Sequence, residues 1–239
     1  MSYLEICVHC YKYSKLLNLQ LSSYVIYGGE YLKDIKYVIY TCEEDIQTNA
    51  VCDFFSDKLN LEKRILPKNV LAARGYGRDM AVKECQSEWI WFADADHLIS
   101  EGSLKSLFDT LKNTEHKFLF PQIAVKNKND ADVDNYLETI SVPDVIDFDF
   151  DKLGIETARK KHRIASGGVQ IVKSDYIKQC GYAYRHTSHE DWVSCRDDKR
   201  ARKKFRESFP DEDIVSIIME GHRHLTHATK RRNDHSAEL

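Results

Sequence analysis

The stretch WIWFADADH (89–97) joins an apolar run to two aspartates, Asp94 and Asp96. A short apolar run of this kind is typical of a buried strand. In an open parallel sheet, ligands bind beyond the carboxyl ends of the strands, so both carboxylates are expected to face a cleft. Two carboxylates at such a bend can share Mn²⁺ or Mg²⁺ and leave positions open for phosphate oxygens. The stretch therefore predicts a cation site in which the cation can bind the oxygens of a diphosphate.

Similar apolar runs occur on both sides of this stretch and alternate with helical patterns. They are YLEICVHC (3–10), KYVIYTC (36–42), KRILP (63–67) and KFLFP (117–121). Apolar residues recur at helical spacing over 46–55 and over 104–111, the latter after a candidate N-cap at Ser100. This alternation predicts an α/β fold, in which a largely parallel, Rossmann-like sheet with right-handed crossovers is flanked by helices.

The second half of the chain starts irregularly and then returns to order. Residues 126–163 are charged and weakly periodic, which predicts surface loops or a small antiparallel part, with the acidic runs at 130–134 and 147–151 as solvated loops. The later runs predict a strand (167–172), a short helix (174–180), a longer helix (188–205) and a final strand (213–219). We expect one domain over residues 1–229 and a polar, mobile tail over 230–239.

Bulk composition limits the classes of function. The 239 residues are 42% hydrophobic, enough for one good core. The net charge of -3 gives no global reason to bind nucleic acid or an anionic membrane. The seven cysteines are an odd number and fall mostly in apolar runs, which favours a reduced, cytoplasmic compartment. No apolar run reaches the length of about eighteen residues that a membrane span needs, so we expect no membrane insertion.

The segment RGYGRDMAVKECQSEWIWFADAD (74–96) resembles a block of family 2 glycosyltransferases with the GT-A fold. In that block an A-R-N segment, a short helix and a G-E-Y-I strand precede a D-x-D motif, and the resemblance is good over residues 71–111. It implies that Arg78 contacts a nucleotide-sugar donor. Asp79 stands where the family has asparagine, and it is the second donor contact implied. Asp94 and Asp96 match the motif that binds the metal and the donor.

Two other parts of the N-terminal half match the family's recognition of the base and ribose. His9 lies near the end of the first apolar run, and the acidic cluster Glu43, Glu44 and Asp45 follows the second. We take His9 and Glu44 as candidate donor contacts. The cluster can equally favour the N-terminus of the next helix through the helix dipole, and both interpretations stay open.

The segment SGGVQIVKSDYIKQCGYAYRHTSHEDWVSCR (166–196) resembles the acceptor-side half of the same family. The matching positions are Gly167, Gly168, Gly181, Glu190, Asp191 and Arg196. Glycine lets a substrate approach the backbone closely, so Gly167 and Gly168 are candidate donor contacts. The resemblance implies that Asp191, beside Glu190, is the base that deprotonates the acceptor. Ser188 and Asp191 also fit a capping box, and the two roles can coexist.

Three histidines follow the final apolar run, at His222, His224 and His227. The resemblance implies that a late histidine completes the metal shell opposite the D-x-D motif. If the strand continues, His222 and His224 face the same side. We therefore expect Asp94 and Asp96 to bind the metal together with His222 or His224.

Together these features predict a glycosyltransferase that uses Mn²⁺ or Mg²⁺ and a nucleotide-sugar donor. The resemblance implies a UDP-sugar, the commonest donor type in the family. The resemblance implies inversion at the anomeric carbon. The acceptor is open: a glycan, a protein, a small molecule or a modified nucleic-acid base. Two alternatives remain, a sugar-1-phosphate nucleotidyltransferase and a non-enzymatic module that binds carbohydrate or nucleic acid. The nucleotidyltransferase is less favoured, because CVHCYKYSK (7–15) replaces a glycine- and arginine-rich phosphate loop.

Overall fold

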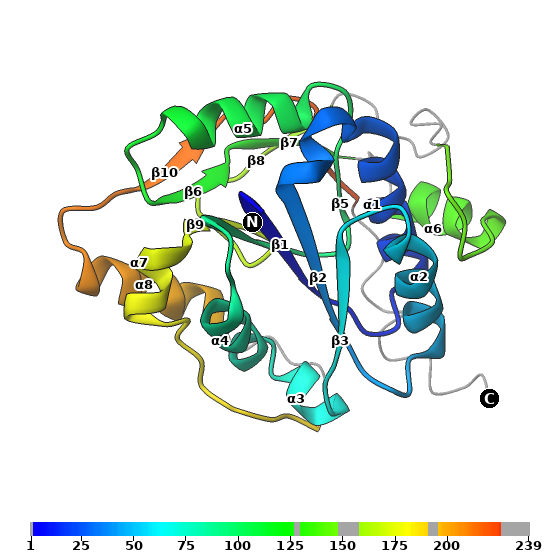
Figure 1. The fold of residues 1–239 in the computed structure, drawn as a ribbon, viewed down its shortest axis with the longest axis horizontal. Coiled ribbons are helices and arrows are strands. Elements are labelled where there is room, and N and C mark those ends of the chain that lie inside the picture. Colours follow the sequence, from blue (N-terminus) through cyan, green and yellow to red (C-terminus); the bar gives the residue numbers. More distant parts are fainter. Residues whose placement is uncertain (1, 127–129, 148–157, 191–195, 226–239) are drawn as a thin grey trace.

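The computed structural model describes residues 2–126, 130–147, 158–190 and 196–225 (Figure 1). Its centre is a seven-stranded sheet with the order β10-β6-β9-β4-β1-β2-β3. The strands are β1 (Leu4–His9), β2 (Ile35–Thr41), β3 (Leu61–Ile65), β4 (Trp89–Ala93), β6 (Phe118–Pro121), β9 (Val169–Lys173) and β10 (Ile214–Ile217). Every one of them lies within or overlaps a run predicted to be a strand.

The sheet is mostly parallel, and this confirms the predicted α/β class. Only β9 runs antiparallel to its neighbours, β4 and β6, among the pairings of this sheet. All five residues of β4 are buried, as expected for a strand whose two faces are both covered. At one edge, β3 has the charged sequence LEKRI and is only partly buried, which discourages pairing with another chain.

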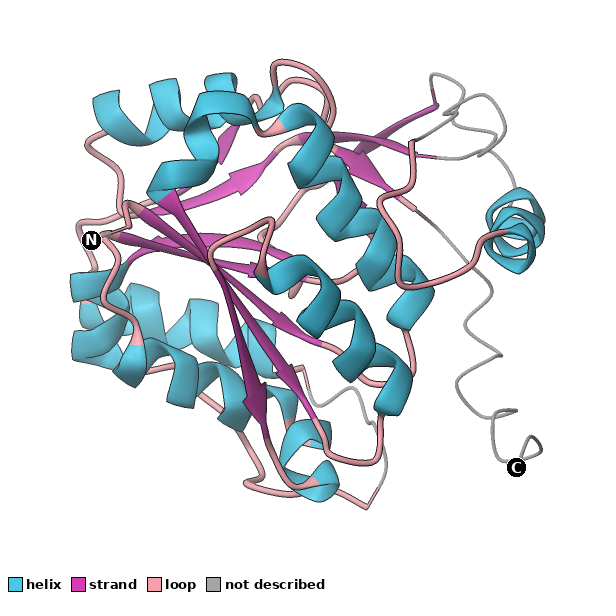
Figure 2. Ribbon diagram, turned by 45° about the vertical axis from the view of Figure 1, so that its right-hand side comes forward, coloured by secondary structure: helices cyan, strands magenta, loops and turns pink. Residues whose placement is uncertain are grey.

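Helices cover both faces of the sheet and produce a three-layer architecture (Figure 2). On one face lie α1 (Ser14–Tyr27), α2 (Ile46–Ser56) and α5 (Ser103–Asn113), and near them the 3₁₀ helix η1 (Gly29–Asp34). On the other face lie α3 (Lys68–Ala72), α4 (Arg74–Glu84), α7 (Ser174–Cys180) and α8 (Asp197–Ser208). Successive strand residues point to opposite faces, so Trp91 packs in the first core and Phe92 in the second.

A second, four-stranded sheet has the order β5-β11-β7-β8. Its strands are β5 (His97–Leu98), β11 (Arg223–His224), β7 (Ile123–Lys126) and β8 (Ala158–Lys161). β11 is antiparallel to β5 and parallel to β7, and β7 is antiparallel to β8. The predicted small antiparallel part is therefore present. It pairs the residues just after β4 with residues near the end of the described chain.

Three local predictions were wrong. The acidic run at 130–134 is not a loop but the start of α6 (Asp130–Thr139), which buries Val133 and Leu137 one helical turn apart. The N-cap of α5 is Gly102, with φ +80°, and not Ser100. Residues 188–190 are not helical, and α8 begins at Asp197.

No helix in the described ranges is long and apolar enough to cross a membrane. The predicted tail, residues 230–239, lies outside these ranges.

Candidate functional site

Asp94 directly follows β4 at the carboxyl end of the central strands, and two arginines of α4 converge on it. Arg74 Nη1 lies 3.1 Å and Arg78 Nη2 lies 3.3 Å from the same oxygen, Asp94 Oδ1. Positions 74 and 78 are one helical turn apart, so both side chains project from one face of α4. Two guanidinium groups at a strand end can bind a phosphate-bearing ligand through paired hydrogen bonds.

Arg78 is held from behind by a buried polar chain. The side chain is only 3% exposed, and Nη1 donates to the hydroxyl of Tyr182 at 3.0 Å. That hydroxyl donates to Gln170 Oε1 at 3.0 Å, on β9. Arg74 shows no such support among the residues that the structure describes, and it is 30% exposed. The pair therefore combines one fixed guanidinium with one that solvent and ligands can reach.

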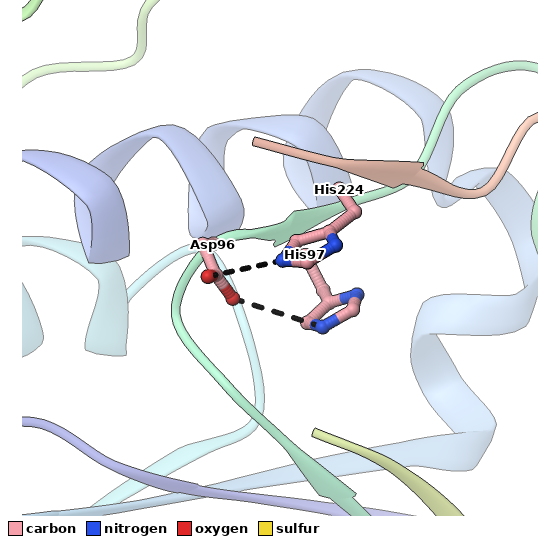
Figure 3. Close-up of side chains that lie close together, drawn as sticks. All are labelled: Asp96, His97 and His224. Carbon is pink, nitrogen blue, oxygen red and sulfur yellow. Dashed lines mark hydrogen bonds and ion pairs between the residues drawn. The ribbon is translucent and has the colours of Figure 1, made fainter. Parts of the chain in front are cut away.

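Asp96, His97 and His224 form a cluster that could hold a cation (Figure 3). Each offers one ligand atom, and these atoms all lie within 4.8 Å of one another. His224 Nε2 is 3.3 Å from Asp96 Oδ2, and His97 Nε2 is 3.7 Å from Asp96 Oδ1. The two imidazoles come together because His97 and His224 are paired residues of β5 and β11. Their rings stack, with centroids 4.5 Å apart.

A fourth group, His222, lies next to this cluster but outside it. Its Nε2 is 2.9 Å from Nδ1 of His97, and the side chain is buried. Burial lowers the pKa of His97 to about 4, and burial also lowers the pKa of His222 well below its ordinary value. Both rings are therefore neutral near pH 7, the form in which imidazole binds metals.

Gly168 connects the arginine-bound aspartate to the histidine cluster. A Cβ at this position would lie 2.7 Å from Asp94 Oδ2 and 2.9 Å from His97 Nε2. Both groups thus approach the same glycine backbone, and any larger residue would collide with them. The two halves of the site are therefore neighbours.

The donor set fits a divalent cation. One carboxylate and two neutral imidazoles are ligands that Mn²⁺ and other first-row transition metals accept. Of the four metal ligands predicted from the sequence, the structure brings Asp96 and His224 together and adds His97. Asp94 instead faces the two arginines, and His222 is hydrogen-bonded to His97.

His9, at the end of β1, lies beside α4. Its ring stacks on Tyr40 with centroids 4.6 Å apart, and its Nε2 lies 2.2 Å from where a Cβ on Gly77 would be. Only glycine permits so close an approach of helix and ring. Burial, followed by the charges of Arg78 and Arg74, lowers the pKa of His9 well below its usual value. A neutral imidazole is thus placed near the arginine pair.

The acidic cluster after β2 divides into two roles. Asp45 is the N-cap of α2, where Oδ1 accepts a hydrogen bond from the backbone N–H of Thr48 at 3.2 Å. The helix-start interpretation is therefore right for Asp45. Glu44 is exposed, and its nearest charged partner is Lys68 at 4.0 Å. Glu44 has no contact with the arginines or the histidine cluster among the interactions resolved.

Asp79 is buried behind the arginine pair. Its Oδ1 accepts the backbone N–H of Tyr182 at 2.8 Å, and its Oδ2 pairs with Lys83 at 2.7 Å. Oδ1 thus ties α4 to the turn after α7, whose Tyr182 supports Arg78, whereas the pair with Lys83 lies within α4. This places Asp79 in a positioning role.

The predicted acid pair of the second half is only partly covered by the structure. Glu190 is exposed, and Asp191 lies outside the described residues. The backbone N–H of His189 donates to the carbonyl of Asn69 on α3 at 2.8 Å, so the segment reaches the helix that follows β3. Whether Asp191 converges on the same cleft stays a prediction. Gly167 lies nearer the site, since its added Cβ would be 3.2 Å from Arg78 Nη1.

Reasoning from the sequence missed Arg74 and His97. Arg74 lies four residues before Arg78, a helical spacing that would have indicated a shared face. His97 directly follows the D-A-D motif, but nothing local shows that it pairs with His224. That contact depends on the pairing of two strands, β5 and β11, that lie far apart in the sequence.

Comparison with known proteins identifies the chain's relatives. The profile described as Glycosyl transferase family 2 matches residues 47–181. Residues 1–349 of S. aureus TarS superpose with a TM-score of 0.64 at 17% identity, covering 95% of this chain and 60% of that one. The same part of TarS in complex with UDP-GlcNAc gives a TM-score of 0.61 at 14% identity, covering 100% and 62%.

The mannosyltransferase PcManGT from Pyrobaculum calidifontis, in complex with GDP-Man and Mn²⁺, gives a TM-score of 0.54 at 16% identity, covering 96% of this chain and 58% of that one. The chain thus spans about three fifths of each of these solved chains. At these identities the likeness shows a common GT-A fold. No functionally curated protein matches the sequence. Since the family profile covers more than half of its residues, the chain belongs to glycosyl transferase family 2.

Proposed function

We propose that this chain is a metal-dependent glycosyltransferase that moves a sugar from a nucleotide-diphosphate sugar to an acceptor hydroxyl. The observation that carries the proposal is the close approach of two groups to Gly168. Asp94, which binds both arginines, and His97, which belongs to the cluster that could hold a cation, both lie against the backbone of this glycine. A site with two guanidinium groups beside a bound divalent cation suits a diphosphate, because the guanidinium groups and the cation each neutralise part of its negative charge.

In this proposal Arg74 and Arg78 bind the donor diphosphate, and Asp94 keeps both guanidinium groups in place until the donor arrives. Gly167 and Gly168 let the donor pass close to the backbone just before β9. His9 and Glu44 line the side of the nucleoside. We take UDP as the nucleotide, supported by TarS having been solved with UDP and with UDP-GlcNAc.

Asp96, His97 and His224 would hold Mn²⁺ or Mg²⁺. When bound, the cation supplies Lewis-acid neutralisation of the departing diphosphate. Asp191, with Glu190 beside it, is the proposed base that takes the proton from the acceptor hydroxyl as its oxygen attacks the anomeric carbon. The attack comes from the side opposite the leaving group, so the configuration inverts.

The acceptor is a hydroxyl of a glycan, a protein, a small molecule or a modified nucleic-acid base. We further propose that residues 1–229 act as one domain in the cytoplasm, where the six described cysteines, all buried and free, stay reduced.

A screen of nucleotide sugars tests the proposal. The purified chain is mixed with UDP-, GDP- and TDP-sugars with and without Mn²⁺, and nucleoside diphosphate release and thermal stabilisation are measured. We expect one donor to be hydrolysed slowly and only with metal, and Asp96→Asn to abolish this. Asp109→Asn, an exposed acid of α5 paired with Lys105, is the control and should behave as the parent.

Release of pyrophosphate from a nucleoside triphosphate would replace the proposal with a sugar-1-phosphate nucleotidyltransferase. Stabilisation by carbohydrate or nucleic acid alone, unchanged in Asp96→Asn, would replace it with a binding module.

A further inference from the structure

The position of His222 raises the question of what a buried histidine does beside a cation cluster that it does not join. Its Nε2 lies 2.9 Å from His97 Nδ1. Its other ring nitrogen, Nδ1, has no hydrogen-bond partner among the described residues. The ring packs against Trp91, with centroids 6.0 Å apart. The polar chemistry of this side chain is therefore directed at His97.

The backbone before His222 is built to place it there. Gly221 has φ +64°, a conformation that residues with a Cβ rarely adopt. Its carbonyl accepts a hydrogen bond from Ser100 Oγ at 3.0 Å. A Cβ at Gly221 would lie 2.2 Å from Ser100 Oγ. The turn is thus locked to the segment just after β5, the strand that carries His97.

Counting protons shows what the contact does. A hydrogen bond between two ring nitrogens needs one N–H and one lone pair. In one arrangement His222 donates from Nε2 to His97 Nδ1, which leaves the proton of neutral His97 on Nε2, facing Asp96. In the other arrangement His97 donates from Nδ1 to His222 Nε2. The lone pair of His97 Nε2 then faces Asp96 and His224, and the two rings together still hold two protons.

We propose that His222 is a positioning residue that accepts a hydrogen bond from Nδ1–H of His97 and so presents the Nε2 lone pair of His97 to a divalent cation held with Asp96 and His224. The inference rests on the proposed metal-dependent function and adds to it a residue that orients one of the ligands. Partners of this kind fix the tautomer and ring orientation of a ligating histidine, and their loss weakens metal affinity by about 10–100-fold.

The test measures cation binding to the chain alone, with no donor present. Mn²⁺ affinity is determined by calorimetry for the parent, His222→Phe and His222→Gln. Phenylalanine keeps a ring in the buried position but cannot accept a hydrogen bond, whereas the glutamine amide oxygen can accept one in place of Nε2. We expect His222→Phe to raise the Mn²⁺ Kd by about 10–100-fold and His222→Gln to recover most of that loss.

Two further variants make the test specific. In His97→Ala the ligand itself is gone, so adding His222→Phe should cause little further loss of affinity, because the two residues act as a unit. His116→Gln changes an exposed histidine outside the cluster and should bind Mn²⁺ as the parent does. Thermal unfolding without metal identifies any variant that loses binding only because it fails to fold.

The inference is overturned if folded His222→Phe binds Mn²⁺ like the parent, or if the phenylalanine and glutamine variants lose affinity equally. Failure of the proposed function gives a different result. A chain that binds Mn²⁺ with the expected variant pattern but releases nucleoside diphosphate from no donor keeps the positioning role and loses the transferase activity.

Discussion

Gly168→Ala is the smallest change that reaches both halves of the site at once. The added Cβ would lie 2.7 Å from Asp94 Oδ2, 2.8 Å from Asp94 Cγ and 2.9 Å from His97 Nε2. Carbon and polar atoms in ordinary contact sit about 3.5 Å apart or more, so both side chains must retreat by the better part of an ångström. Asp94 would then move relative to Arg74 and Arg78, and His97 relative to Asp96.

The expected loss follows from these displacements. Overpacking of this size typically costs about 1–3 kcal/mol of stability, which most folded domains tolerate. A misplacement of about 1 Å in a positioned site can cost about 10²-fold in rate. We therefore expect Gly168→Ala to remain folded while its kcat/KM for donor hydrolysis falls by about 10²-fold and its Mn²⁺ affinity weakens.

The assay compares metal-dependent nucleoside diphosphate release by Gly168→Ala and by Gly167→Ala. At Gly167 the nearest atom to an added Cβ is Arg78 Nη1, at 3.2 Å, a contact that a shift of a few tenths of an ångström relieves, so this neighbouring variant should lose clearly less activity. Thermal unfolding is followed in parallel. If Gly168→Ala is folded and keeps both full activity and Mn²⁺ affinity, the site does not depend on the backbone approach described above.

Three other changes probe charge, positioning and packing. Burial raises the pKa of Glu5 above its ordinary value of 4.5, so between the unfolded and folded pKa values the folded protein keeps a proton that the unfolded chain has lost, and stability falls as pH rises through this window. The stability of Glu5→Gln relative to the parent, measured by urea unfolding, should therefore grow with pH over the window, by about 1.4 kcal/mol per unit of pKa difference. A difference that does not change with pH would refute this. Arg78→Lys removes the fork that reaches Tyr182 and Asp94, so donor KM should rise by about tenfold or more while Mn²⁺ affinity changes little; an unchanged KM would place the donor elsewhere. Phe205→Ala in α8, where the side chain is fully buried, should lower the free energy of unfolding by about 3–5 kcal/mol in urea titration, and a loss below about 1 kcal/mol would contradict the packing described for that face.

Local chemistry determined much of this protein from the sequence alone. The apolar run of β4 must be buried, and its abrupt change to Asp94 marks a strand end wherever the strand sits. The period of α7 and its end at Gly181, with φ +71°, are likewise properties of neighbouring residues. Alternation of such elements leaves few topologies other than a mostly parallel α/β sheet. Fold class and the position of the acidic motif could therefore be predicted.

Contacts between distant segments could not be predicted in this way. The period of Val133 and Leu137 was hidden among aspartates, and only the core beneath α6 shows that the segment is a helix. The choice among the histidines was decided by the register of β11 against β5, which sets His224 opposite His97 and leaves His222 behind it. A shift of one residue reverses which side chains share a face. The sequence thus supplied the aspartates and histidines that can bind a cation, and the pairing of distant strands decided which of them come together in one site.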